Sequence, residues 1–277
     1  MALAVLFRLI FTALALAIIL VSARILQILP PRKPPVPRKR SSPTTLMIVL
    51  GSGGHTAEML AMLKDLDPTL YTRRIWVVGE DDWLSKKRAV EFEQRLEEKM
   101  RAGGAGKDGS AVKADNMRTR QELRPNTGSN SYTIAEVPRA RRIHQPLYTT
   151  PFSALLCLWA CVKLLMAPPG VGHTKQPLSL QSKSKFSKPS TYPDLIITNG
   201  PATATILIIA TCMLRFFNAR QADTQGKMRT IYVESWARVK RLSLSGKLLV
   251  GVVDRFVVQW PSLDGVGGRG EYLGVLV

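Results

Sequence analysis

Residues 46–58 read LMIVLGSGGHTAE, and this stretch decides the fold class. A short apolar run ends abruptly in a glycine-rich turn. Apolar residues with helical spacing follow, namely Met59, Leu60, Met62, Leu63 and Leu66. A strand, a glycine turn and a helix in this order predict the opening unit of an α/β fold.

Further apolar runs predict strands along the rest of the chain, at 74–79, 132–137, 194–198, 230–233 and 255–259. Helical patterns lie between them, at 83–100, 145–167 and 202–217. The runs are continuous rather than alternating, which is typical of strands buried on both faces. Strands that alternate with helices predict a mainly parallel, Rossmann-like sheet.

The segment at the start of the chain predicts a membrane anchor. Residues 2–29 are almost wholly apolar, and about 20 apolar residues cross a bilayer as a helix. The uncharged core is only 15 residues long, from Leu9 to Ala23, so we expect Arg8 and Arg24 to snorkel to the two interfaces. A cleaved signal peptide is the alternative interpretation, although bulky apolar residues follow the small ones where a cleavage site would lie.

Charge predicts how this anchor is oriented. The chain has 39 Lys and Arg against 20 Asp and Glu, a net charge of +19, and no acidic residue precedes Glu58. Basic residues cluster after the apolar segment, so the positive-inside rule places the rest of the chain in the cytosol. We therefore predict an anchor at 1–29, a basic, proline-rich tether at 30–45 and one cytosolic domain at 46–277. Polar composition predicts flexible insertions at 101–131 and 168–193.

Composition also excludes several classes of protein. Three cysteines with no regular framework argue against a disulfide-stapled secreted domain. Cys157 and Cys161 lie one helical turn apart, but a metal site needs more ligands, so we interpret them as core thiols and expect neither a metal nor a cofactor. The basic charge gathers near the N-terminal apolar segment and in the loops, which does not favour a nucleic-acid partner.

A second apolar segment, 152–167, is interpreted as a buried crossover helix or as a helix lying against the bilayer.

The glycine turn is a candidate anion site. Gly51, Ser52, Gly53 and Gly54 lie between a strand and a helix, where the backbone comes close to a ligand and unpaired N–H groups point outward. The pattern matches neither common nucleotide fingerprint, but it favours phosphate or pyrophosphate. His55 follows the turn directly. The positive end of the helix disfavours imidazolium, so His55 is a candidate general base. The alternatives are that His55 caps the helix or that it hydrogen-bonds a neighbouring loop. Glu58, one turn later, is a candidate for orienting His55, or alternatively a residue that only complements the positive end of the helix.

Two further strand ends belong to the same predicted edge of the sheet. Asn199 and Gly200 end one strand, while Glu234 and Ser235 end the next and are followed by Arg238. In open α/β sheets ligands bind outside the carboxyl ends of the strands. We therefore predict that these residues contribute to acceptor or phosphate binding.

In this order, the motifs resemble one family. They are LGSGGHTAE (50–58), NGP (199–201), YVESWARV (232–239), LSGK (244–247), QWP (259–261) and YLG (272–274). The resemblance is to the membrane-anchoring subunit of the two-chain UDP-N-acetylglucosamine transferase of the dolichol-linked oligosaccharide pathway. It covers most of the predicted domain and none of the two polar insertions.

The resemblance implies the acceptor-binding half of an inverting GT-B glycosyltransferase. A soluble catalytic subunit would supply the donor half as a heterodimer, and this chain would be inactive alone. The pair would add the second GlcNAc to GlcNAc-pyrophosphoryl-dolichol at the cytosolic face of the endoplasmic reticulum membrane and of the continuous nuclear envelope. The alternative is a pure membrane scaffold without a part in the chemistry.

The last residues of the chain are the predicted contact with that partner. They are apolar to the end, which is typical of a final core strand or of a docking element. By resemblance to the family we assign the second role to Tyr272, Leu273, Gly274, Val275, Leu276 and Val277.

Overall fold

The computed structural model describes residues 2–29, 44–105, 131–141, 145–167, 192–200 and 202–277. They contain a seven-stranded sheet in the order β3-β2-β1-β4-β5-β6-β7, with every neighbouring pair parallel. This order continues the doubly wound arrangement of Rossmann folds, so the predicted fold class is confirmed. The strands are β1 (Thr45–Val49), β2 (Arg73–Gly79), β3 (Tyr132–Val137), β4 (Leu195–Asn199), β5 (Arg229–Val233), β6 (Arg255–Val258) and β7 (Gly270–Tyr272).

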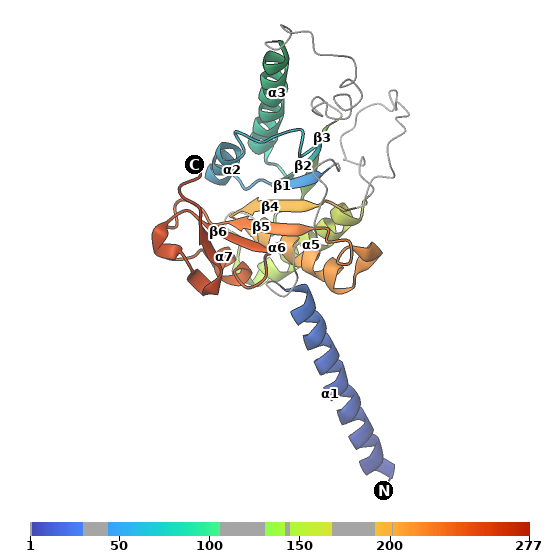
Figure 1. The fold of residues 1–277 in the computed structure, drawn as a ribbon. Coiled ribbons are helices and arrows are strands. Elements are labelled where there is room, and N and C mark those ends of the chain that lie inside the picture. The colour runs from blue at the N-terminus through green and yellow to red at the C-terminus, as the bar shows by residue number, and fades with distance from the viewer. Residues whose placement is uncertain (1, 30–43, 106–130, 142–144, 168–191, 201) are drawn as a thin grey trace, which may run out of the picture.

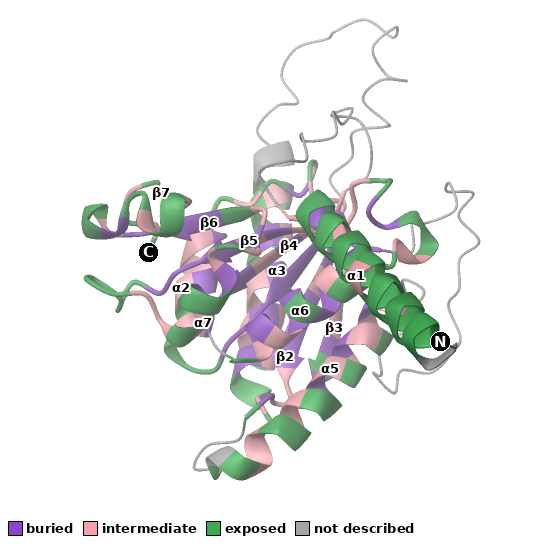
Figure 2. Ribbon diagram, turned by 90° about the horizontal axis from the view of Figure 1, so that it is seen from below, coloured by how far each residue is buried: buried purple, intermediate pink, exposed green. Residues whose placement is uncertain are grey.

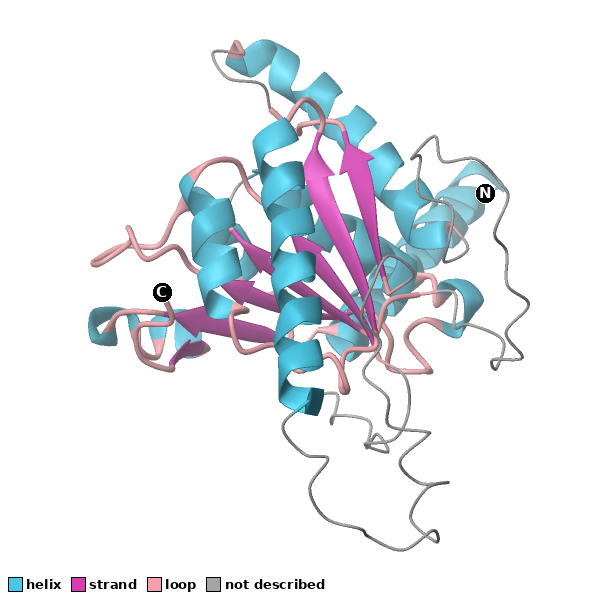
Figure 3. Cartoon of the chain, turned by 90° about the horizontal axis from the view of Figure 1, so that it is seen from above, coloured by secondary structure: helices cyan, strands magenta, loops and turns pink. Residues whose placement is uncertain are grey.

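Helices cover both faces of the sheet, as Figures 1 and 3 show. One face carries α2 (Gly54–Met62) and α3 (Trp83–Ala105). The other face carries α5 (Thr150–Met166), α6 (Ala202–Phe216) and α7 (Leu244–Leu249). Single 3-10 turns are η2 (Leu147–Thr149), η3 (Ala219–Gln221), η4 (Pro261–Leu263) and η5 (Val266–Gly268). The helix layers make the strands the centre of the core, which explains why their sequences are continuously apolar.

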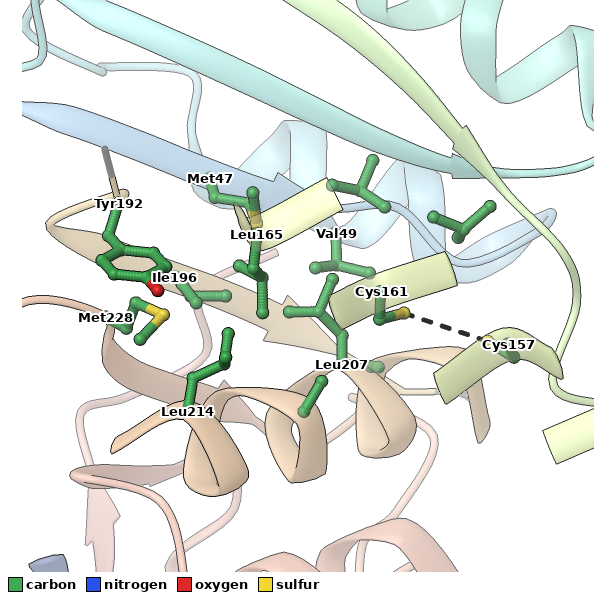
Figure 4. Packing of buried hydrophobic residues seen from close by; sticks show 14 of the residues in the cluster. Met47, Val49, Cys157, Cys161, Leu165, Tyr192, Ile196, Leu207, Leu214 and Met228 are labelled. Atoms are coloured by element: carbon green, nitrogen blue, oxygen red, sulfur yellow. Dashed lines mark hydrogen bonds between the residues drawn. The ribbon is translucent and has the colours of Figure 1, made fainter. Parts of the chain in front are cut away.

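The core between the sheet and the α5–α6 layer contains both predicted thiols (Figure 4). Cys157 and Cys161 are fully buried among apolar side chains, with their sulfur atoms 4.0 Å apart. They belong to the same buried cluster as the β-strand residues Val49 and Ile196. The prediction that they are core residues is therefore confirmed. A second cluster, around Trp76 and Met59, fills the space beneath α2 and α3.

The helix α1 (Ala2–Ile28) leaves the domain from the side of the sheet that carries α5 and α6 (Figures 1 and 2). Among the described residues it is the one helix that is long and apolar enough to cross a membrane. Its apolar window has a mean hydropathy of 2.7, and none of the residues in that window is buried. At a rise of about 1.5 Å per residue its 27 residues exceed the bilayer core of about 30 Å.

Arg24 was predicted to extend toward the membrane interface, and in the structure its side chain contacts the domain. Its guanidinium donates to the carbonyl oxygens of Arg215 (2.7 Å) and Phe216 (2.8 Å) and lies 3.3 Å from a carboxylate oxygen of Asp223. These carbonyls end α6, where a cation also complements the helix dipole. In return, Arg215 donates to the carbonyl of Ile28, at 3.1 Å. The base of α1 is thereby bonded to the domain.

Asp254 connects this junction to the sheet. Its carboxylate accepts from Arg215 (3.0 Å) and from Arg229 (2.7 Å) and also from the backbone N–H of Thr230 (2.9 Å). Burial alone would raise the pKa of Asp254, but the two guanidinium groups and the N–H outweigh it, so the pKa lies below its ordinary value. We call Arg24, Arg215, Asp223, Arg229 and Asp254 the amino-edge network, since Arg229 starts β5 and Asp254 precedes β6.

Several predicted boundaries change in the structure. α3 continues to Ala105, five residues into the predicted insertion at 101–131, and Ser131 is buried. Tyr192, placed in the second insertion, is also buried. β1 begins at Thr45, inside the predicted tether. The remainder of the tether (30–43) and the centres of the insertions (106–130 and 168–191) lie outside the described residues.

Candidate functional site

The glycine turn between β1 and α2 is buried at its base and open at its tip. Gly51 is buried, and its carbonyl accepts from the hydroxyls of Thr56 and Ser85. Ser52, Gly53 and Gly54 are exposed. Gly53 has a φ of +62°, which a residue with a side chain rarely adopts, and a Cβ at either Gly53 or Gly54 would meet no atom within 4 Å. The tip therefore leaves room for a ligand beside the first N–H groups of α2, while Gly51 holds the turn in place.

Four side chains meet at the carboxyl edge of the sheet, and three of them, His55, Glu58 and Asn199, are predicted site residues. The Asn199 side chain donates from Nδ2 to Glu58 (2.6 Å), and its Oδ1 lies 3.1 Å from Nδ1 of His55. Glu58 also accepts from the Ser235 hydroxyl, at 2.9 Å. We call His55, Glu58, Asn199 and Ser235 the carboxyl-edge network. It joins the ends of β1, β4 and β5, as expected from parallel strands that end at one edge.

This network determines which nitrogen of His55 carries the proton. A carboxylate only accepts hydrogen bonds, so Asn199 must turn its NH₂ group toward Glu58 and its oxygen toward His55. That oxygen in turn needs a donor, which is an N–H at Nδ1 of the imidazole. In the neutral ring the lone pair then lies on Nε2. The His55 side chain is 33% exposed, so Nε2 belongs to a partly open site and can accept a proton.

Gly200 fixes the position of the imidazole. A Cβ at this residue would lie 2.6 Å from ring atoms of His55, closer than real carbon contacts allow. The φ of Gly200 is +81°, in the region that favours glycine. The structure thus shows Gly200 packed closely against His55, and its role in ligand binding stays a prediction.

Glu234 has a structural environment rather than an exposed one. It is 1% exposed, and its carboxylate accepts from the backbone N–H groups of Ser235 and Ser243 and from the Ser243 hydroxyl. A buried carboxylate bonded in this way supports the loop after β5, and the part of Glu234 in acceptor binding stays a prediction. Arg238, in contrast, is exposed in this loop together with Lys240 and Arg241, and these three cations are available to a phosphate.

The C-terminal segment is exposed and is bonded to the same edge. Tyr272 ends β7, and the apolar side chains of Leu273, Val275 and Val277 are exposed. The backbone N–H of Leu276 donates to the buried side chain of Gln259 (3.2 Å), which itself donates to the carbonyl of Glu234 (3.0 Å). The last residues are therefore held beside the loop that carries Arg238.

Sequence reasoning placed Ser235 at the correct edge but gave it no role, and it gave none to Gln259. The signal for Ser235 was present, because it directly follows a strand end on the predicted edge.

Among the described residues no group of three or more His, Cys, Asp or Glu side chains is placed to hold a metal. A groove of about 550 Å³ lies between α2 and α3; its lining includes Lys64, Arg88 and Arg95 and none of the residues of the carboxyl-edge network.

Comparison with known proteins identifies the family. Residues 46–276 match the model of the family described as "Oligosaccharide biosynthesis protein Alg14 like". The chain is 38% identical to the UDP-N-acetylglucosamine transferase subunit alg14 of Aspergillus fumigatus, an alignment that covers 79% of this chain and all of the relative. It is 32% identical to the subunit of the same name from Schizosaccharomyces pombe, over 86% of both chains. Identity to the human subunit is 28%, over 84% of this chain and 83% of the human one.

A search of solved structures finds a bacterial enzyme, MurG of Acinetobacter baumannii. The superposition has a TM-score of 0.39 and 12% sequence identity, over 79% of this chain and 42% of MurG. A likeness of this size carries no argument about the site or the architecture. The family model and the relatives, in contrast, cover most of the described domain, and on their evidence the chain belongs to the Alg14 family of oligosaccharide biosynthesis proteins.

Proposed function

We propose that this chain is the acceptor-side subunit of a two-chain UDP-GlcNAc transferase. In this proposal the complex adds the second GlcNAc to GlcNAc-pyrophosphoryl-dolichol during synthesis of the N-glycan precursor. A soluble catalytic subunit binds the donor and forms a heterodimer with this chain. The family and the printed names of its relatives support a transferase subunit, and the carboxyl-edge network is the observation that carries a direct part in the chemistry.

The proposed reaction is a single inverting displacement. The acceptor hydroxyl attacks the anomeric carbon of UDP-GlcNAc, a new C–O bond forms, and UDP leaves with the electron pair of the bond that breaks. Nε2 of His55 takes the hydroxyl proton, a role that suits the tautomer favoured by Asn199. Glu58 and Ser235 act through Asn199 and are positioning residues.

The acceptor pyrophosphate is proposed to lie between the open tip of the glycine turn and the basic loop after β5. Gly53 and Gly54 allow close approach to the N–H groups that begin α2, and Arg238 provides an exposed positive charge. Neither group needs a metal ion to bind a phosphate. In this arrangement the donor-binding partner, and not this chain, contacts the departing UDP.

The proposed location is the membrane of the endoplasmic reticulum, with α1 as a single span and the domain in the cytosol. The length and hydropathy of α1 and the basic residues that follow it support this orientation. Confinement to the bilayer raises the local concentration of a lipid-linked acceptor, an effective-concentration gain that requires no additional contact with the substrate.

The C-terminal segment 272–277 is proposed as part of the partner interface. Its apolar side chains are exposed, and one backbone hydrogen bond to Gln259 holds it beside the site. Deletion of residues 274–277 is expected to abolish co-purification of the soluble subunit while the chain stays in the membrane fraction. Retained co-purification would contradict this assignment.

The function itself is tested by turnover of purified components. We expect the full chain to transfer no GlcNAc alone and to do so once the soluble subunit is added. Turnover by the chain alone would overturn the two-chain proposal. A pure scaffold predicts that Asn199→Ala keeps both partner binding and full activity, whereas the proposal predicts retained binding with a large loss of activity.

A further inference from the structure

A stripe of large apolar side chains on α5 has no covering element among the described residues. The stripe consists of Phe152, Leu155, Leu156 and Trp159, all exposed, and Phe152 is 70% exposed. Tyr148, just before the helix, is also exposed. Exposed apolar patches rimmed by polar groups mark protein or membrane contacts on soluble domains.

The stripe lies on one side of the helix and the core contact on the other. Residues of an α-helix advance by about 100° each, so positions 152, 155, 156, 159 and 163 share one face. The buried residues Cys157, Cys161 and Leu165 share the opposite face and pack toward α6. Both faces of α5 are therefore apolar, and only the face that packs toward α6 is covered.

The composition of the open face is that of a membrane interface rather than of a protein contact rich in ion pairs. α5 contains no acidic residue, and its one charged side chain is Lys163, whose Nζ lies 5.1 Å from the centre of the Trp159 ring. Tryptophan and tyrosine prefer the headgroup level of a bilayer, and lysine near a helix end extends its charge to the surface. A basic, aromatic and aliphatic face therefore fits an anionic lipid surface.

The position of α5 relative to α1 makes this contact geometrically consistent. α1 leaves the domain from the face of the sheet covered by α5 and α6 (Figure 2). α5 packs on α6, and α6 is bonded to the base of α1 through Arg24 and Arg215. The amino-edge network therefore holds the α5–α6 layer on the side of the domain where a membrane crossed by α1 would begin.

We propose that α5 is a second membrane contact, an interfacial helix whose open stripe lies in the cytosolic leaflet while the Arg24 junction sets the tilt of the domain. The inference rests on the proposed span α1 and goes beyond it. It makes the domain a body docked on the bilayer at two places instead of one that swings on a tether. Docking of this kind would hold the carboxyl-edge network at a fixed height above the plane in which a lipid-linked acceptor moves.

The test uses the full chain reconstituted in vesicles of phosphatidylcholine and phosphatidylserine. The vesicles also contain a lipid whose acyl chain bears a group that forms a carbene on illumination and labels nearby residues. Mass spectrometry then measures labelling of each peptide. We expect α1 and α5 to be labelled several-fold more than α3. The triple variant Phe152→Ser, Leu155→Ser, Trp159→Ser is expected to lower α5 labelling to the level of α3, with α1 unchanged. Trp83→Ser is the matched control, because Trp83 is also 70% exposed but begins α3 on the other face of the sheet.

Two outcomes would overturn the proposal and one would overturn its foundation. Labelled α1 with α5 at the level of α3 means that the stripe faces water. Loss of α5 labelling when the soluble subunit is added means that a protein covers it. Unlabelled α1 means that the proposed span itself is wrong. Arg24→Gln sharpens the result, because it is expected to reduce labelling of α5 and to leave labelling of α1 intact.

Discussion

Two polar networks lie at opposite edges of the same parallel sheet, and they differ in burial and in charge. The amino-edge network consists of buried ion pairs around Asp254 and bonds α1 to the domain. The carboxyl-edge network is partly exposed and is built from hydrogen bonds through the neutral amide of Asn199. The first consists mainly of buried charges, and the second leaves about a third of the His55 side chain exposed. We infer that one edge of the sheet maintains the structure and that the other performs the chemistry.

The largest expected effect is on stability, at the amino edge. Asp254→Asn removes the charge shared by Arg215 and Arg229 and leaves two guanidinium groups poorly compensated. Breaking a buried ion pair from one side costs about 3–5 kcal/mol. Chemical denaturation of the detergent-solubilised chain measures this loss. The control is Glu271→Gln, in the exposed pair with Arg255, where a change of less than about 1 kcal/mol is expected.

Acid provides an independent check on the same carboxylate. The pKa of Asp254 is lowered in the folded chain, so its contribution to stability is complete above the unfolded value of about 3.9 and is lost as the pH falls through the folded value. The wild-type chain should therefore lose more stability than Asp254→Asn in this acidic window. Parallel pH curves for the two proteins would contradict the assignment.

The next effect is on activity, at the carboxyl edge. Gly200→Ala places a Cβ where the His55 ring lies and is expected to displace the imidazole by a fraction of an ångström or more. Misplacement of a reacting group by about 1 Å costs on the order of a hundredfold in rate. Turnover by the reconstituted pair measures it. Gly251→Ala is the matched control, since its Cβ would meet no atom within 4 Å, and equal turnover of the two variants would contradict the packing argument.

The smallest effect is expected at Ser235. Ser235→Ala removes one hydrogen bond to Glu58 and leaves the bond from Asn199 in place. One such bond contributes about 1 kcal/mol, which corresponds to a loss of no more than about tenfold in turnover. The loss should appear in kcat and not in KM for the acceptor, and Ser235→Thr, which keeps the hydroxyl, should restore it. A change in KM alone would assign Ser235 to binding instead.

The sequence was sufficient to predict the elements whose local pattern of apolar residues is long enough to recognise. Continuous apolar runs between polar segments placed β3 at Tyr132–Val137, and they placed the other five of the first six strands within one residue of their observed starts and ends. The motifs at the strand ends then placed His55, Glu58 and Asn199 at one edge, because parallel strands share that edge.

What the sequence did not reveal depends on contacts between distant residues. α7 is only six residues long, and β7 only three, so neither has enough periodicity to be detected. The packing of Gly200 on His55 and the bonds from Arg24 to the end of α6 join residues that are about 145 and 190 positions apart in the chain. The sequence showed that Glu234 lies at a strand end, but it did not show that Ser243 donates hydrogen bonds to the Glu234 carboxylate.

The most direct test of the account is the turnover of His55 variants in the reconstituted pair, at saturating acceptor. Removal of a general base costs about 10²- to 10⁴-fold, and we expect a loss in this range for His55→Ala. His55→Gln keeps an amide that can bond to Asn199 but has no basic nitrogen, so it should be as inactive as the alanine variant. Both variants should still bind the soluble subunit. Wild-type turnover in either variant would contradict the central claim that the carboxyl edge of this chain takes part in the chemistry.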